Sequence, residues 1–214
     1  MKRLLTLCIL LLAVMTAAAQ DKYYAQRASQ FEVLPVHSNS LVFLGDGNTE
    51  ACEWHEMFCN RHIKNRGIRS DRSSWLVNRL DTIVGARPKK VFLSIGINDL
   101  MAGEKPDAIA GNIDRILTRF EKESPWTRIY LTSLLPTNPA LSTEKIDLKE
   151  QIEETNRLLE ALCTEERKNL QYIDVYSTLI DDQRLLDPKY TNDGLHLTGE
   201  GYLRWKEEIE KYVK

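Results

Sequence analysis

Short apolar runs recur along this chain, and longer amphipathic segments separate them. Four of the runs are apolar at consecutive positions, which is typical of strands buried on both faces in the middle of a parallel sheet. A fifth, weaker candidate covers residues 62–65. The four clear runs are residues 41–44, 91–95, 129–134 and 172–176.

Between the runs, apolar residues recur every three or four positions, which predicts helices with one buried face. Four such stripes lie within residues 75–83, 109–120, 148–162 and 202–212. A helix beside a sheet must bury one face, so packing is the expected role of these stripes. Strand and helix alternate along the chain, and this order predicts right-handed crossovers. We therefore expect an α/β fold, a three-layer sandwich around a central parallel sheet of about five strands.

The first 20 residues resemble a secretory leader rather than part of the fold. Lys2 and Arg3 are followed by an apolar stretch from Leu4 to Val14, and small residues precede Gln20. This order predicts a signal peptide over residues 1–20. The stretch is too short to span a bilayer comfortably. We expect an exported protein, periplasmic or extracellular, with one domain over residues 21–214.

Charge and cysteine content exclude some classes of protein. Without the leader, 27 basic and 31 acidic residues leave a net charge of −4, with no basic run. This balance gives no electrostatic reason to expect nucleic acid as a partner. The remaining cysteines are Cys52, Cys59 and Cys163. An odd number does not indicate a disulfide framework, and whether Cys52 and Cys59 form a bridge stays open.

The spacing of Cys52, His55, Cys59 and His62 invites a test for a metal site. On one continuous helix, the first and last of these residues would lie ~15 Å apart. Four ligands spread over that length cannot enclose one zinc ion. We expect no metal site there.

Polar residues with catalytic potential follow the predicted strands. In an open α/β sheet, ligands bind beyond the carboxyl ends of the strands. The segments found there are Gly45-Asp46-Gly47-Asn48, Asn65-Arg66-Gly67, Gly96-Ile97-Asn98-Asp99 and, near the C-terminus, Asp193-Gly194-Leu195-His196. Each also has a purely structural interpretation, as a helix cap, a turn or a packing residue. Four such segments in this order are more specific than any one of them.

These segments resemble the sequence blocks of the SGNH (GDSL-like) hydrolases, particularly the bacterial branch similar to platelet-activating-factor acetylhydrolase subunits. The likeness covers roughly residues 39–212. It implies a flavodoxin-like α/β fold and carboxylic ester hydrolysis without a cofactor. One departure is Ser70, where these proteins often have glycine. The other is Gly47, which stands where the family has its nucleophilic serine.

The resemblance assigns a role to each matching residue. His196 would be the base and Asp193 would orient it. The N–H groups near Gly47 and Gly67, together with the amide of Asn98, would hold the oxyanion. Asp46, Gly96 and Asp99 would support the site. Acyl transfer needs this set because a hydroxyl must lose its proton while negative charge develops on the carbonyl oxygen.

Gly47 leaves the activity of the chain open, because glycine has no side chain that can attack an ester. A natural loss of the serine and a deliberate inactivation of an active esterase fit the sequence equally well. Two hypotheses follow for a small-molecule or carbohydrate ester as partner. The chain is an esterase scaffold for acetyl or short acyl groups that is weak or inactive, or it is a non-catalytic protein that binds an ester or glycan. A third hypothesis, a flavodoxin-like nucleotide binder, is disfavoured because no glycine-rich phosphate loop follows the first strand.

Overall fold

The computed structural model describes residues 22–214. The described chain falls into two units, which divide after Pro35. In the first unit, residues 22–33 are helical. The predicted leader over residues 1–20 lies outside the described residues, and the single domain over 21–214 stays a prediction.

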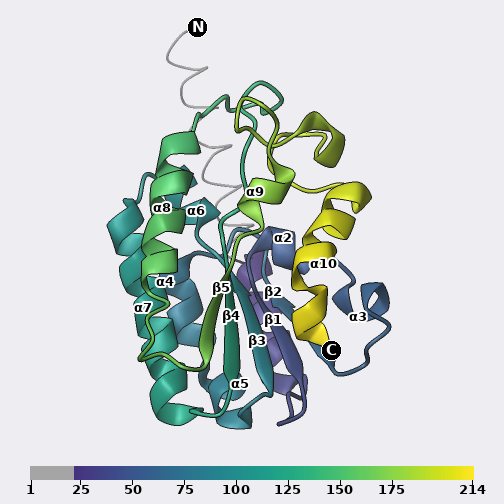
Figure 1. The fold of residues 1–214 in the computed structure, drawn as a ribbon. Coiled ribbons are helices and arrows are strands. Elements are labelled where there is room, and N and C mark those ends of the chain that lie inside the picture. Colours follow the sequence, from purple (N-terminus) through teal and green to yellow (C-terminus); the bar gives the residue numbers. More distant parts are fainter. Residues whose placement is uncertain (1–21) are drawn as a thin grey trace, which may run out of the picture. The chain divides into compact units, whose positions relative to one another are not determined.

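The second unit is built on one parallel sheet, which confirms the predicted fold class. The five strands stand in the order β2-β1-β3-β4-β5, so the chain starts near one edge and crosses to the other (Figure 1). Register brings Gly45 opposite Gly67 and Ser94, where all three strands end. The strands are β1 Leu41–Gly45, β2 Ile63–Gly67, β3 Lys90–Ser94, β4 Arg128–Thr132 and β5 Leu170–Ile173.

Alternating side chains of the central strands supply two separate cores. Val42 and Leu44 of β1 point into one hydrophobic cluster, and Leu41 and Phe43 point into the other. Both faces of the sheet are therefore buried, as the continuous apolar runs predicted.

The helices cover the two faces in the expected three layers. One face packs against α4 Ser73–Leu76, α5 Asp81–Ala86, α6 Ile97–Met101, α7 Pro106–Glu123 and α8 Lys149–Ala161. The other packs against α3 Trp54–Met57 and α10 Gly199–Val213. In Figure 1, α7 and α8 lie on one side of the sheet and α10 and α3 on the other. The two remaining short helices after residue 36 are α2 Gly47–Glu50 and α9 Tyr176–Leu179.

Aromatic rings join β1, β3 and β4 on the face beneath α10. The rings of Phe43 and Phe92 stack at 4.7 Å, and those of Phe92 and Tyr130 at 4.9 Å. Trp54 stacks on Phe43 at 4.5 Å and meets Trp205 of α10 edge to face. This row ties the strands that position the site to the C-terminal helix.

The strand predicted over residues 129–134 ends at Thr132, and two other predicted elements also differ from the structure in extent. The predicted strand 172–176 starts earlier and ends at Ile173, because the next N–H groups, of Val175 and Tyr176, donate to Ser133 Oγ. The predicted helix 75–83 is divided by a 3₁₀ turn, η1 Val77–Arg79. The remaining 3₁₀ turn, η2 Pro188–Tyr190, precedes the segment that carries His196.

The three cysteines after the predicted leader are free thiols, so Cys52 and Cys59 are not bridged to each other. Within residues 22–214, no helix combines the length and apolar character that crossing a membrane requires.

Candidate functional site

The predicted site residues gather where β1, β2 and β3 end, and Asp46 is one of the buried ones. Its side chain is buried and caps α2 by accepting the Asn48 N–H at 3.1 Å. Burial raises its pKa to about 7, only partly offset by that hydrogen bond, and the charges of Asp71 and Asp99 raise it further. Asp46 is therefore a helix cap and a buried acid at once.

Gly47 begins α2 in an ordinary backbone conformation. A Cβ added there would lie 3.6 Å from the Cα of Arg69 and 3.7 Å from its Cγ, which is normal van der Waals contact. The glycine is therefore not required by space or by backbone strain. A serine would fit at this position.

His196 and Asp193 form the pair that their three-residue spacing predicted. His196 Nδ1 lies 2.7 Å from Asp193 Oδ2, while the His196 and Leu195 N–H groups donate to Asp193 Oδ1 at 2.8 and 2.9 Å. Burial raises the pKa of Asp193, but these hydrogen bonds outweigh it and lower the pKa to about 2. The carboxylate is thus ionised over the whole physiological range. The Asp193 carboxylate binds Nδ1 of the His196 ring, so the other ring nitrogen, Nε2, is left to exchange a proton with a reactant.

Hydrogen bonds join this C-terminal segment to the start of α2. Asn48 Nδ2 donates to the Leu195 carbonyl at 3.3 Å, and Tyr202 Oη donates to the Asn48 carbonyl at 2.9 Å. The residue before His196 therefore contacts the residue after Gly47 through the Asn48 side chain. That the His196 ring faces Gly47 stays a prediction.

Gly194 makes this segment possible. Its φ is +77°, and a Cβ there would come within 2.2 Å of the Asn138 carbonyl oxygen. The Gly194 carbonyl also accepts the Asn138 N–H at 2.8 Å. The loop after β4 is thereby fastened to the segment between Asp193 and His196.

Gly67 does not supply the oxyanion donor expected from the sequence. Its N–H already donates to Asn65 Oδ1 at 2.9 Å. A Cβ at Gly67 would lie 2.3 Å from the Glu50 backbone nitrogen, so this glycine lets α2 pack closely on β2. Its role is therefore in packing.

The free N–H in the loop after β2 belongs instead to Ser70. The N–H groups of Ile68, Arg69 and Asp71 donate to Gly45, Glu50 and Ile68 in turn. Among residues 22–214 the Ser70 N–H has no hydrogen-bond partner, and neither has the Gly47 N–H. The sequence signal for Ser70 was its departure from the glycine that is common at this place.

Asn98 lies in α6, whose N-cap is Gly96 with φ +137°. Its Nδ2 donates one hydrogen to the Asp71 carbonyl at 3.0 Å. An amide nitrogen carries a second hydrogen, so this bond orients Asn98 without using all its donors.

Asp99 is buried behind Asn98. It accepts the Ser73 N–H at 2.9 Å and the Ser73 hydroxyl at 2.6 Å. Burial raises the pKa of Asp99, and these hydrogen bonds from Ser73 oppose the shift. Asp99 therefore fixes the start of α4 beside the site.

An ion pair that the sequence did not reveal holds the loop after β2. Arg79 donates to the fully buried Asp71 carboxylate from Nε at 2.8 Å and from Nη2 at 2.6 Å. Nη2 also reaches the Gly45 carbonyl at 3.1 Å. Burial raises the pKa of Asp71 to about 6, although the Arg79 charge opposes the shift. Arg79 thus ties the end of β1 to the residue that orients Asn98.

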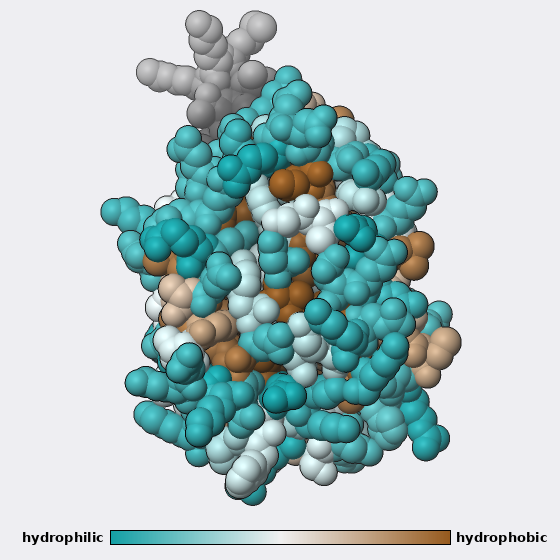
Figure 2. Space-filling view, viewed as in Figure 1, coloured by the Kyte–Doolittle hydropathy of each residue, from teal (hydrophilic) through white to brown (hydrophobic). Residues whose placement is uncertain are grey.

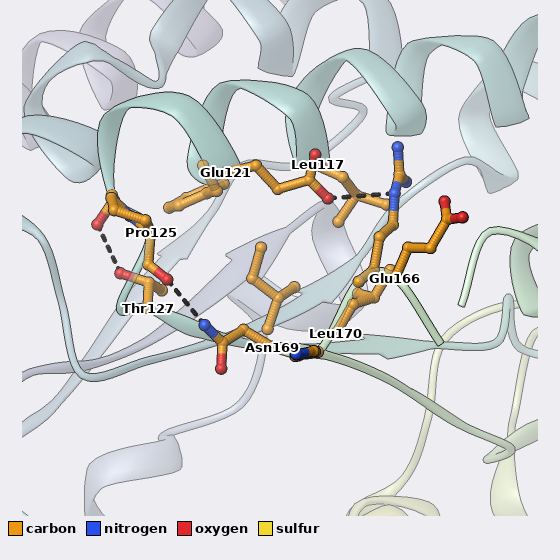
Figure 3. A pocket seen from close by; sticks show the side chains of 12 residues that line it. Leu117, Glu121, Pro125, Thr127, Glu166, Asn169 and Leu170 are labelled. Atoms are coloured by element: carbon orange, nitrogen blue, oxygen red, sulfur yellow. Dashed lines mark hydrogen bonds and ion pairs between the residues drawn. The ribbon is translucent and has the colours of Figure 1, made fainter. Parts of the chain in front are cut away.

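Two cavities of the structure differ in size and in their distance from the site residues. A small one beside Asp46, Asn48 and Leu195 has a volume of about 10 Å³, room for roughly one water molecule. A larger one of about 340 Å³ lies at the opposite edge of the sheet, between the end of α7 and the start of β5 (Figure 3). The larger cavity contains none of the predicted site residues.

The face shown in Figure 2 is mainly hydrophilic, with small apolar patches between polar side chains. Such scattered patches are normal for a protein surface and do not by themselves indicate a docking site.

Comparison with known proteins agrees with this architecture. The GDSL-like Lipase/Acylhydrolase family matches residues 39–204. A Streptococcus pneumonia protein provisionally described as a platelet activating factor is 27% identical, with a TM-score of 0.84 over 98% of this chain and 99% of that one. No curated protein matches the chain significantly.

Two further structures share the fold at 24% identity. A GDSL-like lipase from Bacteroides thetaiotaomicron has a TM-score of 0.73 over 91% of this chain and 96% of that one. An acylhydrolase from Bacteroides fragilis, also provisionally described, has a TM-score of 0.74 over 90% and 94%. The family match, the strand order and the sequence blocks agree, and the chain therefore belongs to the GDSL-like lipase/acylhydrolase family of hydrolases.

Proposed function

We propose that this protein is an exported carboxylic ester hydrolase for acetyl or other short acyl esters, weak in turnover because residue 47 is glycine. The observation that carries the proposal is the Asp193–His196 pair, with Nδ1 and Oδ2 2.7 Å apart. Such a pair orients an imidazole as a base. Both side chains are about half exposed, which fits a role in chemistry rather than in packing.

The proposed reaction starts at His196 Nε2. This nitrogen takes a proton from the attacking hydroxyl, which adds to the ester carbonyl, and it then returns the proton to the leaving alcohol. The developing oxyanion would be held by the N–H groups of Gly47 and Ser70 and by the second hydrogen of the Asn98 amide. One such donor is worth on the order of 3 kcal/mol in the transition state. With no hydroxyl at Gly47, the attack has to come from another hydroxyl, either water in that space or a neighbouring side chain.

The shape of the site supports a small acyl group and a larger alcohol. The cavity beside Asp46 has a volume of only about 10 Å³. The side chains of His196 and Asp193 are about half exposed, at 50% and 55%. A bulky alcohol such as a sugar can therefore stay in solvent while its acetyl group is cleaved. The predicted leader fits an exported carbohydrate ester as substrate.

The test is turnover of p-nitrophenyl acetate and of acetylated sugars by the natural chain and its variants. Gly47→Ser should raise turnover at least ~10²-fold, because base, orienter and oxyanion donors act as a unit with the nucleophile. Gly47→Ala is the matched control, since it adds the same Cβ without a hydroxyl. His196→Ala in the Gly47→Ser background should abolish the gain. A folded Gly47→Ser protein that is no faster than Gly47→Ala contradicts the proposal.

Gly47 itself favours a second candidate, a non-catalytic protein that captures an ester or glycan. In that case the natural chain should bind an acetylated sugar in calorimetry, and Gly47→Ser should remain inactive towards the same compound. Turnover restored by the serine would exclude this candidate.

A further inference from the structure

Ser70 holds a backbone conformation that serine rarely adopts. Its φ is +60°, in the left-handed region, and the residue is half-buried in the loop after β2. A non-glycine residue in this region is strained, and such strain is found more often at functional sites. In other α/β hydrolases the nucleophilic serine sits on a sharp, strained turn that exposes its hydroxyl.

Both polar groups of Ser70 are available. The Ser70 hydroxyl, like its N–H, has no hydrogen-bond partner within the described part of the chain. In serine hydrolases the N–H of the nucleophile is often one of the oxyanion donors. The free N–H of Ser70 matches that arrangement, and its hydroxyl has no partner within the described residues that would compete with His196.

The neighbours of Ser70 place it in the wall of the site. On one side, the Arg69 Cα lies 3.6 Å from where a side chain at Gly47 would begin. On the other side, the Asp71 carbonyl accepts the amide of Asn98 at 3.0 Å. Ser70 therefore lies between the vacant nucleophile position and the oxyanion amide, on a loop that the buried Arg79–Asp71 pair holds in place.

We propose that Ser70 supplies the nucleophilic hydroxyl in the natural chain, in place of residue 47. This rests on the proposed ester hydrolase function. Ser70 Oγ adds to the carbonyl carbon while its proton passes to His196 Nε2. The alcohol leaves with that proton, giving an acyl ester on Ser70. Water then adds to the acyl group, losing a proton to His196, and the carboxylic acid departs as Ser70 regains its hydrogen.

A fluorophosphonate probe tests this directly, because a nucleophilic serine forms an Oγ–P bond as fluoride leaves. The natural chain should be labelled, and peptide mass mapping should locate the label on Ser70. Labelling should be lost in Ser70→Gly and in His196→Ala. Glycine is the favoured residue at φ +60°, so Ser70→Gly should fold with an unchanged or higher Tm, which separates loss of the hydroxyl from misfolding. Ser74→Ala, at an exposed serine nearby, is the matched control and should label normally.

Turnover of p-nitrophenyl acetate gives an independent readout. Ser70→Gly should lower it at least ~10-fold in the natural chain, but less than ~3-fold in the Gly47→Ser background, where another hydroxyl attacks.

Three results would overturn the proposal. A natural chain that takes no label, beside a Gly47→Ser variant labelled at position 47, refutes Ser70 as nucleophile and leaves the ester hydrolase function standing. Labelling at any residue other than Ser70 in the natural chain refutes it as well. Absence of label in both proteins refutes Ser70 and the proposed function together.

Discussion

The buried carboxyl of Asp46 should make the stability of the fold depend on pH, and Asp46→Asn should remove that dependence. Asparagine keeps an oxygen that can accept the Asn48 N–H at the start of α2, but it carries no charge. The substitution therefore isolates the effect of ionising a group that is 4% exposed.

The size of the effect follows from the pKa of the Asp46 carboxyl in the unfolded and in the folded state. Its pKa is 3.8 in the unfolded chain and about 7 in the folded protein, chiefly because of burial. The folded state therefore binds the proton more tightly. The resulting stabilisation is complete below pH 3.8 and is lost as the pH rises to about 7. Each pKa unit is worth 1.36 kcal/mol, which gives a total of about 4 kcal/mol and about 3 kcal/mol above pH 5.

The assay is urea unfolding at pH 5 and at pH 8.5 for the natural chain, Asp46→Asn and the exposed control Asp182→Asn. The stability of Asp46→Asn relative to the natural chain should increase by about 3 kcal/mol between the two pH values. Asp182→Asn should show no comparable change. A difference between Asp46→Asn and the natural chain that is the same at both pH values would refute the argument, and so would a change of opposite sign.

Three other experiments test the contacts around the site. Gly67→Ala should destabilise the fold by more than about 2 kcal/mol in thermal unfolding, because its Cβ would lie 2.3 Å from a backbone nitrogen of α2. Arg79→Met should cost about 3–5 kcal/mol by leaving the buried Asp71 carboxylate unpaired. Adding Asp71→Asn to Arg79→Met should recover part of that loss; strictly additive effects would argue against a direct pair. Asp193→Asn in the Gly47→Ser background should lower kcat by up to ~10⁴-fold with the fold intact, since the imidazole loses its orienting acceptor, and unchanged kcat would contradict that role.

Much of the fold follows from the order of apolar patterns. Val42, Leu44 and their neighbours alternate between two cores, so strands buried on both faces were evident in the sequence. The strand order was not evident, because the pattern says which face is buried and not which strands pair. The end of β5 also depends on a distant group, the Ser133 hydroxyl, which no local pattern reveals.

In the candidate site, too, some contacts could be predicted from the sequence and others could not. Asp193 and His196 could be paired from sequence because their contact is local, within one turn of chain. Gly67 could not be assigned correctly, since its N–H partner and the close approach of α2 depend on tertiary packing. The Arg79–Asp71 pair was missed for the same reason: a charged residue in an amphipathic segment is ordinarily exposed.

The central claim is that this site holds an intact base and oxyanion pocket, in which a hydroxyl at residue 47 would act as a fast nucleophile. A stopped-flow burst measurement with p-nitrophenyl acetate on Gly47→Ser tests it most directly, because an acyl-enzyme releases its first product faster than it turns over. We expect a burst of about one p-nitrophenol per chain, absent when His196→Ala is added. No burst from a folded Gly47→Ser protein, or a burst that survives His196→Ala, would contradict the claim.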